Sequence, residues 1–363
     1  MVNRRAVLIG GGVTAIAGAA AVLYAVRQMG SMDSYASAMV ALRAPLPSIP
    51  APPDLIRFAS LAANSHNTQA WRFGVSGSTI DLQPDLTRAT PVVDPDNHHL
   101  FASLGCAAEN LVIALASRGM PGEAQFDAAA STIKVRHGIG ATTDAALSDA
   151  IPLRQSTRGM YDGSPVTPPD LAILTRAAQT PGVDLILITD RAQIGRVSDL
   201  IATGNSAQLA DPAFMTELKH WMRFNPRRAL ISGDGLFSAA GGNPVLPDWL
   251  GTTMVDWVFN AAADNAKTAE KIASSAALAV FVAAKADPEH WVLTGRACQR
   301  FALQATAMGL KHAFLNQPVE VASLRPDLAA LIGMPGRRPD LIMRFGRGAA
   351  MPYSPRRPVG EVM

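Results

Sequence analysis

The chain has few cysteines and no spaced set of metal ligands. Only two of its 363 residues are cysteines, Cys106 and Cys298, and each lies in an alanine-rich apolar pattern. This placement is typical of buried small side chains and argues against a disulfide framework. The seven histidines show no His-x3-His spacing, and His98 and His99 are adjacent, so they would diverge on a helix or a strand. We therefore expect no metal site, and the cysteines do not identify the compartment.

Charged residues are also sparse, at 17% of the chain against 48% hydrophobic residues. The net charge is only +3, and the lysines and arginines are scattered instead of forming a stripe with aromatic residues. Nucleic-acid binding is therefore not expected. The composition is not that of a disordered chain, and the length is sufficient for one large core or two modest ones.

One long uncharged run is present, at the N-terminus. Residues 6–26 carry no charge and follow Asn3-Arg4-Arg5, which resembles a twin-arginine export signal. We expect residues 1–38 to be an export signal cleaved after Ala36-Ser37-Ala38. The alternative is an uncleaved membrane anchor, because residues 6–26 are long enough to span a bilayer. Both alternatives predict a protein in the periplasm or on the cytoplasmic membrane.

The same segment fits a loose dinucleotide-binding fingerprint. Gly10-Gly11-Gly12 follow an apolar run, and Asp33 lies at a suitable separation for a ribose contact. However, residues 14–26 lack the polar outer face of a dinucleotide-binding helix, and no second apolar strand leads to Asp33. The export segment or anchor is the better interpretation.

A proline-rich stretch, residues 39–53, is expected to form an extended linker, and the body that follows contains an internal repeat. Pro52-Pro53-Asp54-Leu55 recurs as Pro168-Pro169-Asp170-Leu171, about 116 residues later. A long apolar helical pattern from His99 to Met120 recurs from Glu289 to Leu310, about 190 residues later, and both copies end at a glycine.

The two offsets differ, which predicts an insertion of about 74 residues in the second copy. The insertion is placed at about residues 191–270 and is interpreted as a lid, with a surface decoration as the alternative. We expect an α+β fold in two halves, 54–150 and 151–363, that form a pseudo-dimer around a mostly antiparallel sheet. The expected strands are a hairpin over 71–82 and the segments 132–136, 183–188 and 341–345.

Polar side chains are concentrated where the first helical run gives way to the hairpin. Ser65, Asn67 and Gln69 precede Trp71 within a few residues. Spacing alone is typical of a helix C-cap followed by a polar turn. The run also resembles the flavin-binding corner of the nitroreductase family, although the family's two prolines are replaced here.

A second polar group opens the second half as Arg154-Gln155-Ser156-Thr157-Arg158. Two arginines and two hydroxyls in five extended residues can bind one anion, and a solvated basic loop is the alternative. The spacing is similar to the Arg-x-Ser-x-Arg element of the same family. That resemblance implies that Arg154 and Ser156 hold the phosphate and ribityl end of FMN. It also implies that Arg158 reaches the pyrimidine edge, where a cation stabilises the reduced ring.

Two further segments match positions at which family members contact the flavin. Arg356 and Arg357 resemble a late basic pair that binds the phosphate, with a flexible basic tail as the alternative. Asn316 and Gln317 fall where relatives place a loop against flavin N5, although the usual Gly-Gly is missing. These positions complete the expected FMN site and include no catalytic side chain.

The repeat also predicts the number of sites. The first half has the corner without an arginine element, and the second half has the arginine element without a corner, so the chain is expected to be a monomer with one FMN site. This asymmetry resembles the Acg-type branch of the nitroreductase family over residues 52–363, with residues 221–224 and Asp234-Gly235-Leu236 as its lid.

The resemblance implies an FMN-dependent oxidoreductase that is reduced by NAD(P)H or another reductant. Electrons or hydride would pass to an unidentified electrophilic small molecule. One alternative is a lid-closed, flavin-sequestering protein without NAD(P)H turnover. Another is a flavin-free, membrane-anchored scaffold.

Overall fold

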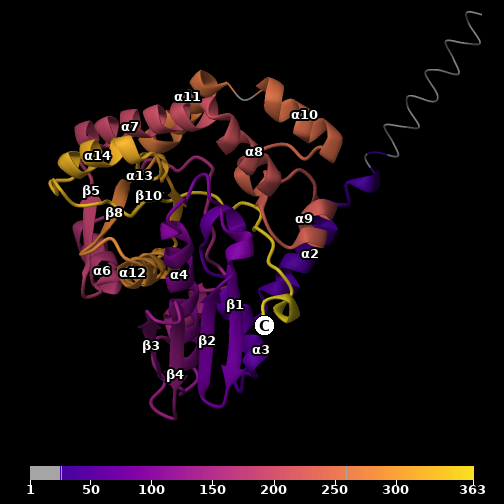
Figure 1. Cartoon of the computed structure of the whole chain (residues 1–363), viewed down its shortest axis with the longest axis vertical. Coiled ribbons are helices and arrows are strands. Elements are labelled where there is room, and N and C mark those ends of the chain that lie inside the picture. The colour runs from indigo at the N-terminus through magenta and orange to yellow at the C-terminus, as the bar shows by residue number, and fades with distance from the viewer. Residues whose placement is uncertain (1–24, 26, 259) are drawn as a thin grey trace, which may run out of the picture.

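The computed structural model describes residue 25, residues 27–258 and residues 260–363 (Figure 1). The predicted Asn3-Arg4-Arg5 signal, the glycine-rich fingerprint and almost all of the predicted span 6–26 lie outside the described residues. They stay predictions.

The first half is a four-stranded antiparallel sheet with the order β1-β2-β4-β3. The two turn residues Gly77 and Ser78 close the expected hairpin between β1 and β2, with Gly77 at a positive φ of 57°. The elements in chain order are α3 (Pro52–Ser60), β1 (Trp71–Ser76), β2 (Thr79–Pro84), α4 (His98–Ala116), β3 (Gly122–Asp127), β4 (Thr132–His137) and α5 (Ala145–Ala150).

The second half repeats this arrangement in a sheet with the order β5-β8-β10-β9. The two strand orders are identical when the strands are matched in chain order, β1 with β5, β2 with β8, β3 with β9 and β4 with β10. Its elements are α6 (Pro168–Ala178), β5 (Val183–Ile188), β8 (Ala277–Ala283), α12 (Pro288–Ala307), β9 (Lys311–Phe314), α13 (Gln317–Glu320), α14 (Arg325–Leu331) and β10 (Leu341–Gly346). The predicted α+β class, with two equivalent halves and antiparallel sheets, is confirmed.

The two halves join where α4 packs against α12, and a pair of glycines allows the helix backbones to touch. A Cβ on Gly105 would lie 2.1 Å from the carbonyl oxygen of Val292, and a Cβ on Gly295 would lie 1.9 Å from that of Ala102. These four residues are related by the repeat, so the contact is pseudo-twofold. By length and composition α4 could cross a membrane, but here it is buried throughout as a core helix.

Polar contacts reinforce the same helix pair. Glu109 of α4 is 1% exposed and accepts bonds of 2.7 Å from both Arg296 and Arg300 of α12. Asn110 accepts a 2.7 Å bond from the Gln299 amide. A buried carboxylate is stabilised when charged donors satisfy both oxygens, as they do here.

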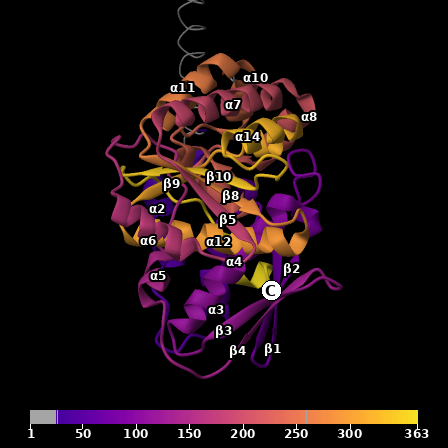
Figure 2. The same cartoon turned by 90° about the vertical axis from the view of Figure 1, so that its left-hand side faces the viewer.

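The insertion separates β5 from β8 in the sequence. Figures 1 and 2 show its helices α7, α10 and α11 at the end of the molecule opposite the sheet of β1 to β4. The elements are α7 (Arg191–Ala210), α8 (Pro212–Trp221), β6 (Met222–Arg223), α9 (Pro226–Ser232), β7 (Leu236–Phe237), α10 (Asp248–Val258) and α11 (Ala261–Ala273).

The insertion also explains the character of β8. Ile194 and Val197 of α7 and Ile272 of α11 pack against Val280 and neighbouring side chains on one face of the sheet. Side chains of α12 and α6 pack on the opposite face. All seven residues of β8 are consequently buried, and its continuous apolar sequence lacks the alternation of a half-exposed strand.

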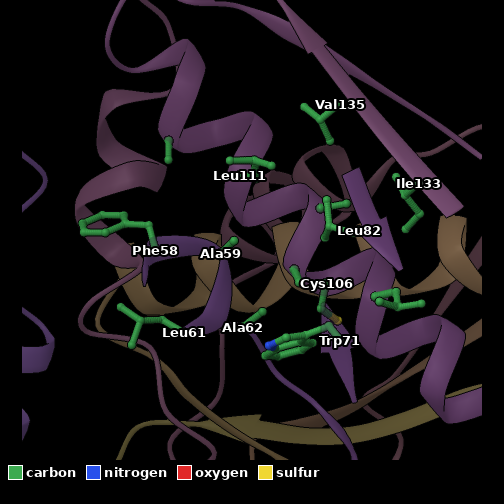
Figure 3. Packing of buried hydrophobic residues seen from close by; sticks show 14 of the residues in the cluster. Phe58, Ala59, Leu61, Ala62, Trp71, Leu82, Cys106, Leu111, Ile133 and Val135 are labelled. Atoms are coloured by element: carbon green, nitrogen blue, oxygen red, sulfur yellow. The ribbon is translucent and has the colours of Figure 1, made fainter. Parts of the chain in front are cut away.

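In the first half, the core forms between the sheet, α3 and α4. Figure 3 shows Leu82, Ile133 and Val135 of the sheet near Leu111 of α4. Trp71, at the start of β1, is fully buried. Truncating a buried aromatic residue of this kind costs about 3–5 kcal/mol. Trp71 therefore anchors the chain firmly in the core, and this fixes the polar residues that directly precede it.

The predicted boundary at residue 38 lies within the helix α2, which spans Met32–Leu42. Tyr35 and Met39 are 1% and 6% exposed, and they pack with Phe237 of the insertion. Apolar residues at helical spacing therefore dock this segment on the body. Cleavage after Ala38 would cut a packed helix, and the extended linker is limited to residues between Arg43 and the start of α3.

Candidate functional site

The corner, residues 64–69, has an unusual backbone. His66, Asn67 and Gln69 have positive φ values of 44°, 55° and 53°, although none is glycine. Each such residue costs of order 1 kcal/mol and persists only when its surroundings fix it. The Asn64 side chain accepts a 3.0 Å bond from the Gln69 backbone, and the Ser65 backbone donates to Ser103 of α4 at 3.2 Å. Strain of this kind is common at binding sites.

The corner is also bonded to a loop of the insertion, Gly233-Asp234-Gly235, which we call the clamp loop. The Gly235 backbone donates to the Asn67 carbonyl at 3.1 Å, and the Asn67 amide donates to the Gly235 carbonyl at 3.1 Å. The Gln69 amide donates to the Gly233 carbonyl at 2.9 Å. The predicted lid segments meet here, because β6 pairs with β7 directly after the clamp loop.

An ion pair holds the clamp loop down. Asp234 is 7% exposed and accepts bonds from Arg223 at 2.7 and 3.1 Å and from Arg88 of the first half. Burial raises the pKa of this carboxyl, but the two arginines outweigh it and leave the pKa below its usual value. Asp234 is thus ionised at neutral pH and ties the insertion to the first half.

The arginine strand, residues 154–158, runs beside β9. Ser156 forms a bridge with His312, and the Thr157 backbone donates to the His312 carbonyl at 2.8 Å. This pairing extends the strand, so alternate side chains Arg154, Ser156 and Arg158 face one side. All three line a single small cavity of about 40 Å³.

Arg356 enters this cavity from the C-terminal tail. Its guanidinium donates to the Ser60, Leu61 and Ala62 carbonyls at 2.6, 3.3 and 3.0 Å, at the end of α3. It also donates to the Asn67 side-chain oxygen at 2.8 Å. A cation at a helix C-terminus is favourable. The tail is therefore fixed in place and is not a free basic segment.

We call this cavity the arginine pocket, and it contains one arginine that the sequence analysis missed. Arg43, at the end of α2, lines it with Arg154, Arg158 and Arg356, and none of the described lining residues is acidic. The helical spacing of Met32, Tyr35 and Met39 could have shown that α2 belongs to the body. The full lining is Arg43, Ala63, Asn64, Asn67, Arg154, Gln155, Ser156, Arg158, Leu236, Pro352, Ser354 and Arg356.

The charges in the arginine pocket are poorly compensated. Burial, together with Arg154, lowers the pKa of Arg43 to about 9. Burial, then Arg43 and Arg154, lowers the pKa of Arg356. The Nε atoms of Arg43 and Arg154 are buried without a hydrogen-bond partner among the described residues. Such a site favours an anion with several oxygens, because it would satisfy free N–H groups and positive charge together.

Several predicted site residues lie elsewhere. Gln69 is fully buried, and its side chain links the clamp loop to the backbone of Arg357. The Arg357 guanidinium turns toward Glu361 instead, donating to its carbonyl at 2.7 Å. Ser65, at the start of the 3-10 turn Ser65–Asn67, is half-buried beside the pocket residue Asn64. These three residues shape the corner and tail without lining the pocket.

Asn316 and Gln317 lie at the start of α13. The Asn316 side chain accepts a 2.9 Å bond from the Ile342 backbone, while the Gln317 side-chain oxygen is buried without a partner among the described residues. The insertion approaches here, because a Cβ on Gly204 of α7 would lie 3.0 Å from the Gln317 backbone. Gln317 therefore has a polar atom left over for a ligand.

Burial also shifts the pKa values of two histidines and one glutamate, which lie in the corner, in α4 and in α13. Burial lowers the pKa of His66 to about 4, with Arg158 and His99 as secondary causes. Burial likewise lowers the pKa of His99 to about 4 and raises that of Glu320, whose carboxyl lies 3.5 Å from the His99 ring. No group of three or more His, Cys, Asp or Glu in the described part of the chain is placed to hold a metal ion.

A larger cavity of about 840 Å³ adjoins the arginine pocket and shares Arg43 and Pro352 with it. It lies between α2, the end of α5 and the tail, and Met39, Leu46 and Phe58 contribute to its mainly apolar lining. Four arginines line the arginine pocket, whereas two, Arg43 and Arg118, line the larger cavity.

No family model matches the chain, but curated proteins of Mycobacterium tuberculosis are similar to it. "Putative NAD(P)H nitroreductase Rv3131" is 26% identical over 323 residues, which cover 85% of this chain and 90% of that protein. "Putative NAD(P)H nitroreductase acg" is 26% identical over 333 residues, with 85% and 93% covered. These names agree with the resemblance of residues 64–69 and 154–158 to elements of the nitroreductase family.

Solved structures of flavin enzymes also resemble part of the chain. The FMN-dependent nitroreductase NfnB from Mycobacterium smegmatis, in complex with NADPH, has a TM-score of 0.37 at 13% identity, covering 56% of this chain and 87% of that chain. The NADPH:FMN oxidoreductase from Vibrio harveyi, complexed with NAD+, has a TM-score of 0.36 at 14% identity, with 58% and 73% covered.

Proposed function

We propose that this chain is an FMN-dependent oxidoreductase of the nitroreductase type with one flavin site. The arginine pocket carries the proposal, because Asn67 of the first half lines it with Arg154, Ser156 and Arg158 of the second. A single chain thus supplies both pieces, and we infer that it acts as a monomer. The names of the M. tuberculosis relatives support the same class of enzyme.

The residues of the pocket fit the phosphate end of FMN. Arg154 and Arg356 would hold the phosphate, since both are buried and lie against the end of α3. Ser156 offers a hydroxyl to the ribityl chain. Arg158 is half-buried with no hydrogen-bond partner among the described residues, so its charge is available to the pyrimidine edge of the ring.

When bound, FMN supplies the hydride and electron chemistry, and the protein positions and tunes it. Gln317 or the neighbouring Asn316 would face flavin N5. No side chain is assigned as a nucleophile. The reductant is NAD(P)H or another donor, and the acceptor is a small electrophile whose identity is open.

The clamp loop favours a second candidate function, flavin sequestration. Asn67 and Gln69 bond to both glycines of the loop, and Leu236 just after it lines the arginine pocket. A lid held this firmly would keep NAD(P)H from the ring. The two functions differ in one observable, which is whether bound flavin is reduced when NADPH is added without oxygen.

The phosphate assignment is tested with the double variant Arg154→Ala/Arg356→Ala. It should lose FMN from the purified protein while far-UV circular dichroism stays unchanged. Arg136→Ala, on the exposed side of β4, is the matched control and should keep FMN. A double variant that stays fully yellow would remove the basis of the assignment.

We also propose that the protein is exported or anchored to the cytoplasmic membrane by residues 6–26. The sequence pattern of the first residues supports this location. Because α2 packs on the body, retention of residues 32–43 after export is part of the proposal. Mass spectrometry of protein recovered from membrane and periplasmic fractions tests it, and an N-terminus at residue 39 would contradict it.

A further inference from the structure

Helix α2 joins parts of the chain that are distant in sequence. The Ser31 hydroxyl caps its N-terminus by accepting the Ser34 backbone N–H at 3.1 Å. The Tyr35 ring lies 4.5 Å from that of Phe237 in the insertion, and its hydroxyl donates to the Tyr353 carbonyl in the tail at 2.7 Å. Phe237 follows the pocket residue Leu236, and Tyr353 lies between the pocket residues Pro352 and Ser354. Helix α2 therefore packs against two segments that contribute to the arginine pocket.

Arg43, directly after α2, is delivered into the arginine pocket by this docking. It is 8% exposed, and its Nη1 donates to the Pro152 carbonyl at 2.7 Å and the Arg154 carbonyl at 3.3 Å. Its guanidinium lies 3.8 Å from the centre of the Tyr353 ring. These contacts fix the plane of the guanidinium beside the arginine strand.

Apart from the Tyr353 ring, no contact of Arg43 among the described residues balances its positive charge. No carboxylate pairs with it among the described residues, and its buried Nε has no partner. Burying an unpaired cation beside two other arginines is costly. A side chain that only donated hydrogen bonds to two carbonyls would not need a positive charge. The buried charge of Arg43 therefore points to an anion that binds in the pocket.

We propose that Arg43 is a further phosphate-binding arginine of the flavin site, so that α2 is a structural part of that site. The inference rests on the proposed FMN function. It adds a phosphate-binding residue from α2, a segment separate from the corner, the arginine strand and the tail. It also predicts that docking of α2 and binding of the phosphate favour each other, because coupling between two equilibria is reciprocal.

The test compares binding of FMN and of riboflavin, which lacks the phosphate, to full-chain variants by flavin fluorescence. Arg43→Gln should weaken FMN binding by about 10- to 100-fold, the range expected for one charged hydrogen bond, and leave riboflavin unchanged. Arg43→Lys, which keeps the charge, should fall between Arg43→Gln and the wild type.

Arg57→Ala is the matched control. Arg57 bonds to the Leu42 and Ala44 carbonyls on either side of Arg43, at 3.0 and 2.7 Å, but lies outside the pocket lining. It should leave the ratio of FMN to riboflavin affinity unchanged. If Arg43→Gln weakens both flavins equally, or neither, Arg43 is only a structural latch and the inference fails.

Hydrogen exchange gives a readout that does not depend on turnover. Adding inorganic phosphate or FMN should slow amide exchange in residues 32–43 of the wild type, and this protection should be lost in Arg43→Gln. Equal protection in both proteins would overturn the coupling. Absence of flavin binding by the wild type itself would instead refute the proposed function, so the two failures are distinguishable.

Discussion

The glycine pair between α4 and α12 gives the strongest stability prediction. In Gly105→Ala the new methyl would lie 2.1 Å from the Val292 carbonyl oxygen, whereas nonbonded approaches of this kind stay near or above 3.0 Å. The obstacle is helix backbone, so the helices must separate by about 1 Å along the seam. Overpacking of a core costs about 1–3 kcal/mol and more where backbone must move. We expect a loss of at least about 3 kcal/mol in the free energy of unfolding.

Urea unfolding followed by circular dichroism measures this loss. Gly295→Ala should cost a similar amount, because its methyl would meet the equivalent carbonyl of Ala102 at 1.9 Å. The double variant should cost less than the sum, since one separation of the helices relieves both clashes.

Gly195→Ala is the control for the glycine pair. Gly195 is exposed in α7, and no atom of the described residues outside its own stretch of helix lies within 4 Å of the position that the new methyl would occupy. This change should stabilise the protein by about 0.5–1 kcal/mol, as alanine does in an open helix. An unchanged stability in Gly105→Ala, or additive costs in the double variant, would refute the proposed packing of the two halves.

Two further predictions concern buried charge. Asp234→Asn should destabilise the protein by about 3 kcal/mol and speed release of FMN, because it leaves Arg223 and Arg88 without their buried carboxylate. Stopped-flow fluorescence measures the release. The control is Asp127→Asn, in a half-exposed pair with Lys134, which should change both quantities far less. His312 is buried, and neither ring nitrogen has a hydrogen-bond partner among the described residues; burial lowers its pKa from 6.5 to about 3. Its stabilising contribution is therefore lost as pH falls below about 6.5, by about 1.4 kcal/mol per pH unit, because only the unfolded chain gains the proton. His312→Leu should have a correspondingly shallower decline between about pH 6 and pH 4 in urea unfolding, and an identical decline in both proteins would contradict this.

Much of the fold could be predicted from the sequence because the repeat marks equivalent elements. The Pro-Pro-Asp-Leu pair locates α3 and α6, and the glycine-ended patterns locate α4 and α12. The strand β8 was missed because both of its faces are covered, which removes the alternation that identifies a strand. The predicted boundary at residue 38 falls inside α2, which begins at Met32, a few residues after the apolar run of residues 6–26. The amphipathic spacing of α2 is hard to separate from that neighbouring run in the sequence.

The candidate site was predictable where one local segment provides several ligands. Arg154, Ser156 and Arg158 alternate along one extended segment, which places them on one side. Spacing alone left a solvated basic loop as the alternative, and the family resemblance favoured the anion site. Arg43 reaches the pocket only through the tertiary docking of α2. The spacing of Met32, Tyr35 and Met39 indicates that α2 packs on the body but does not specify where. Gln69 and Arg357 have polar groups suitable for a ligand, but the fold directs them to the clamp loop and to Glu361.

The most direct test of the flavin site is a visible spectrum of the purified full chain, recorded before and after NADPH is added without oxygen. A single flavin site predicts a flavin band corresponding to about one FMN per chain, and oxidoreductase function predicts that the band bleaches. A band that persists would favour sequestration or another reductant. A colourless protein that takes up no added FMN would contradict the assignment of the arginine pocket as a flavin site.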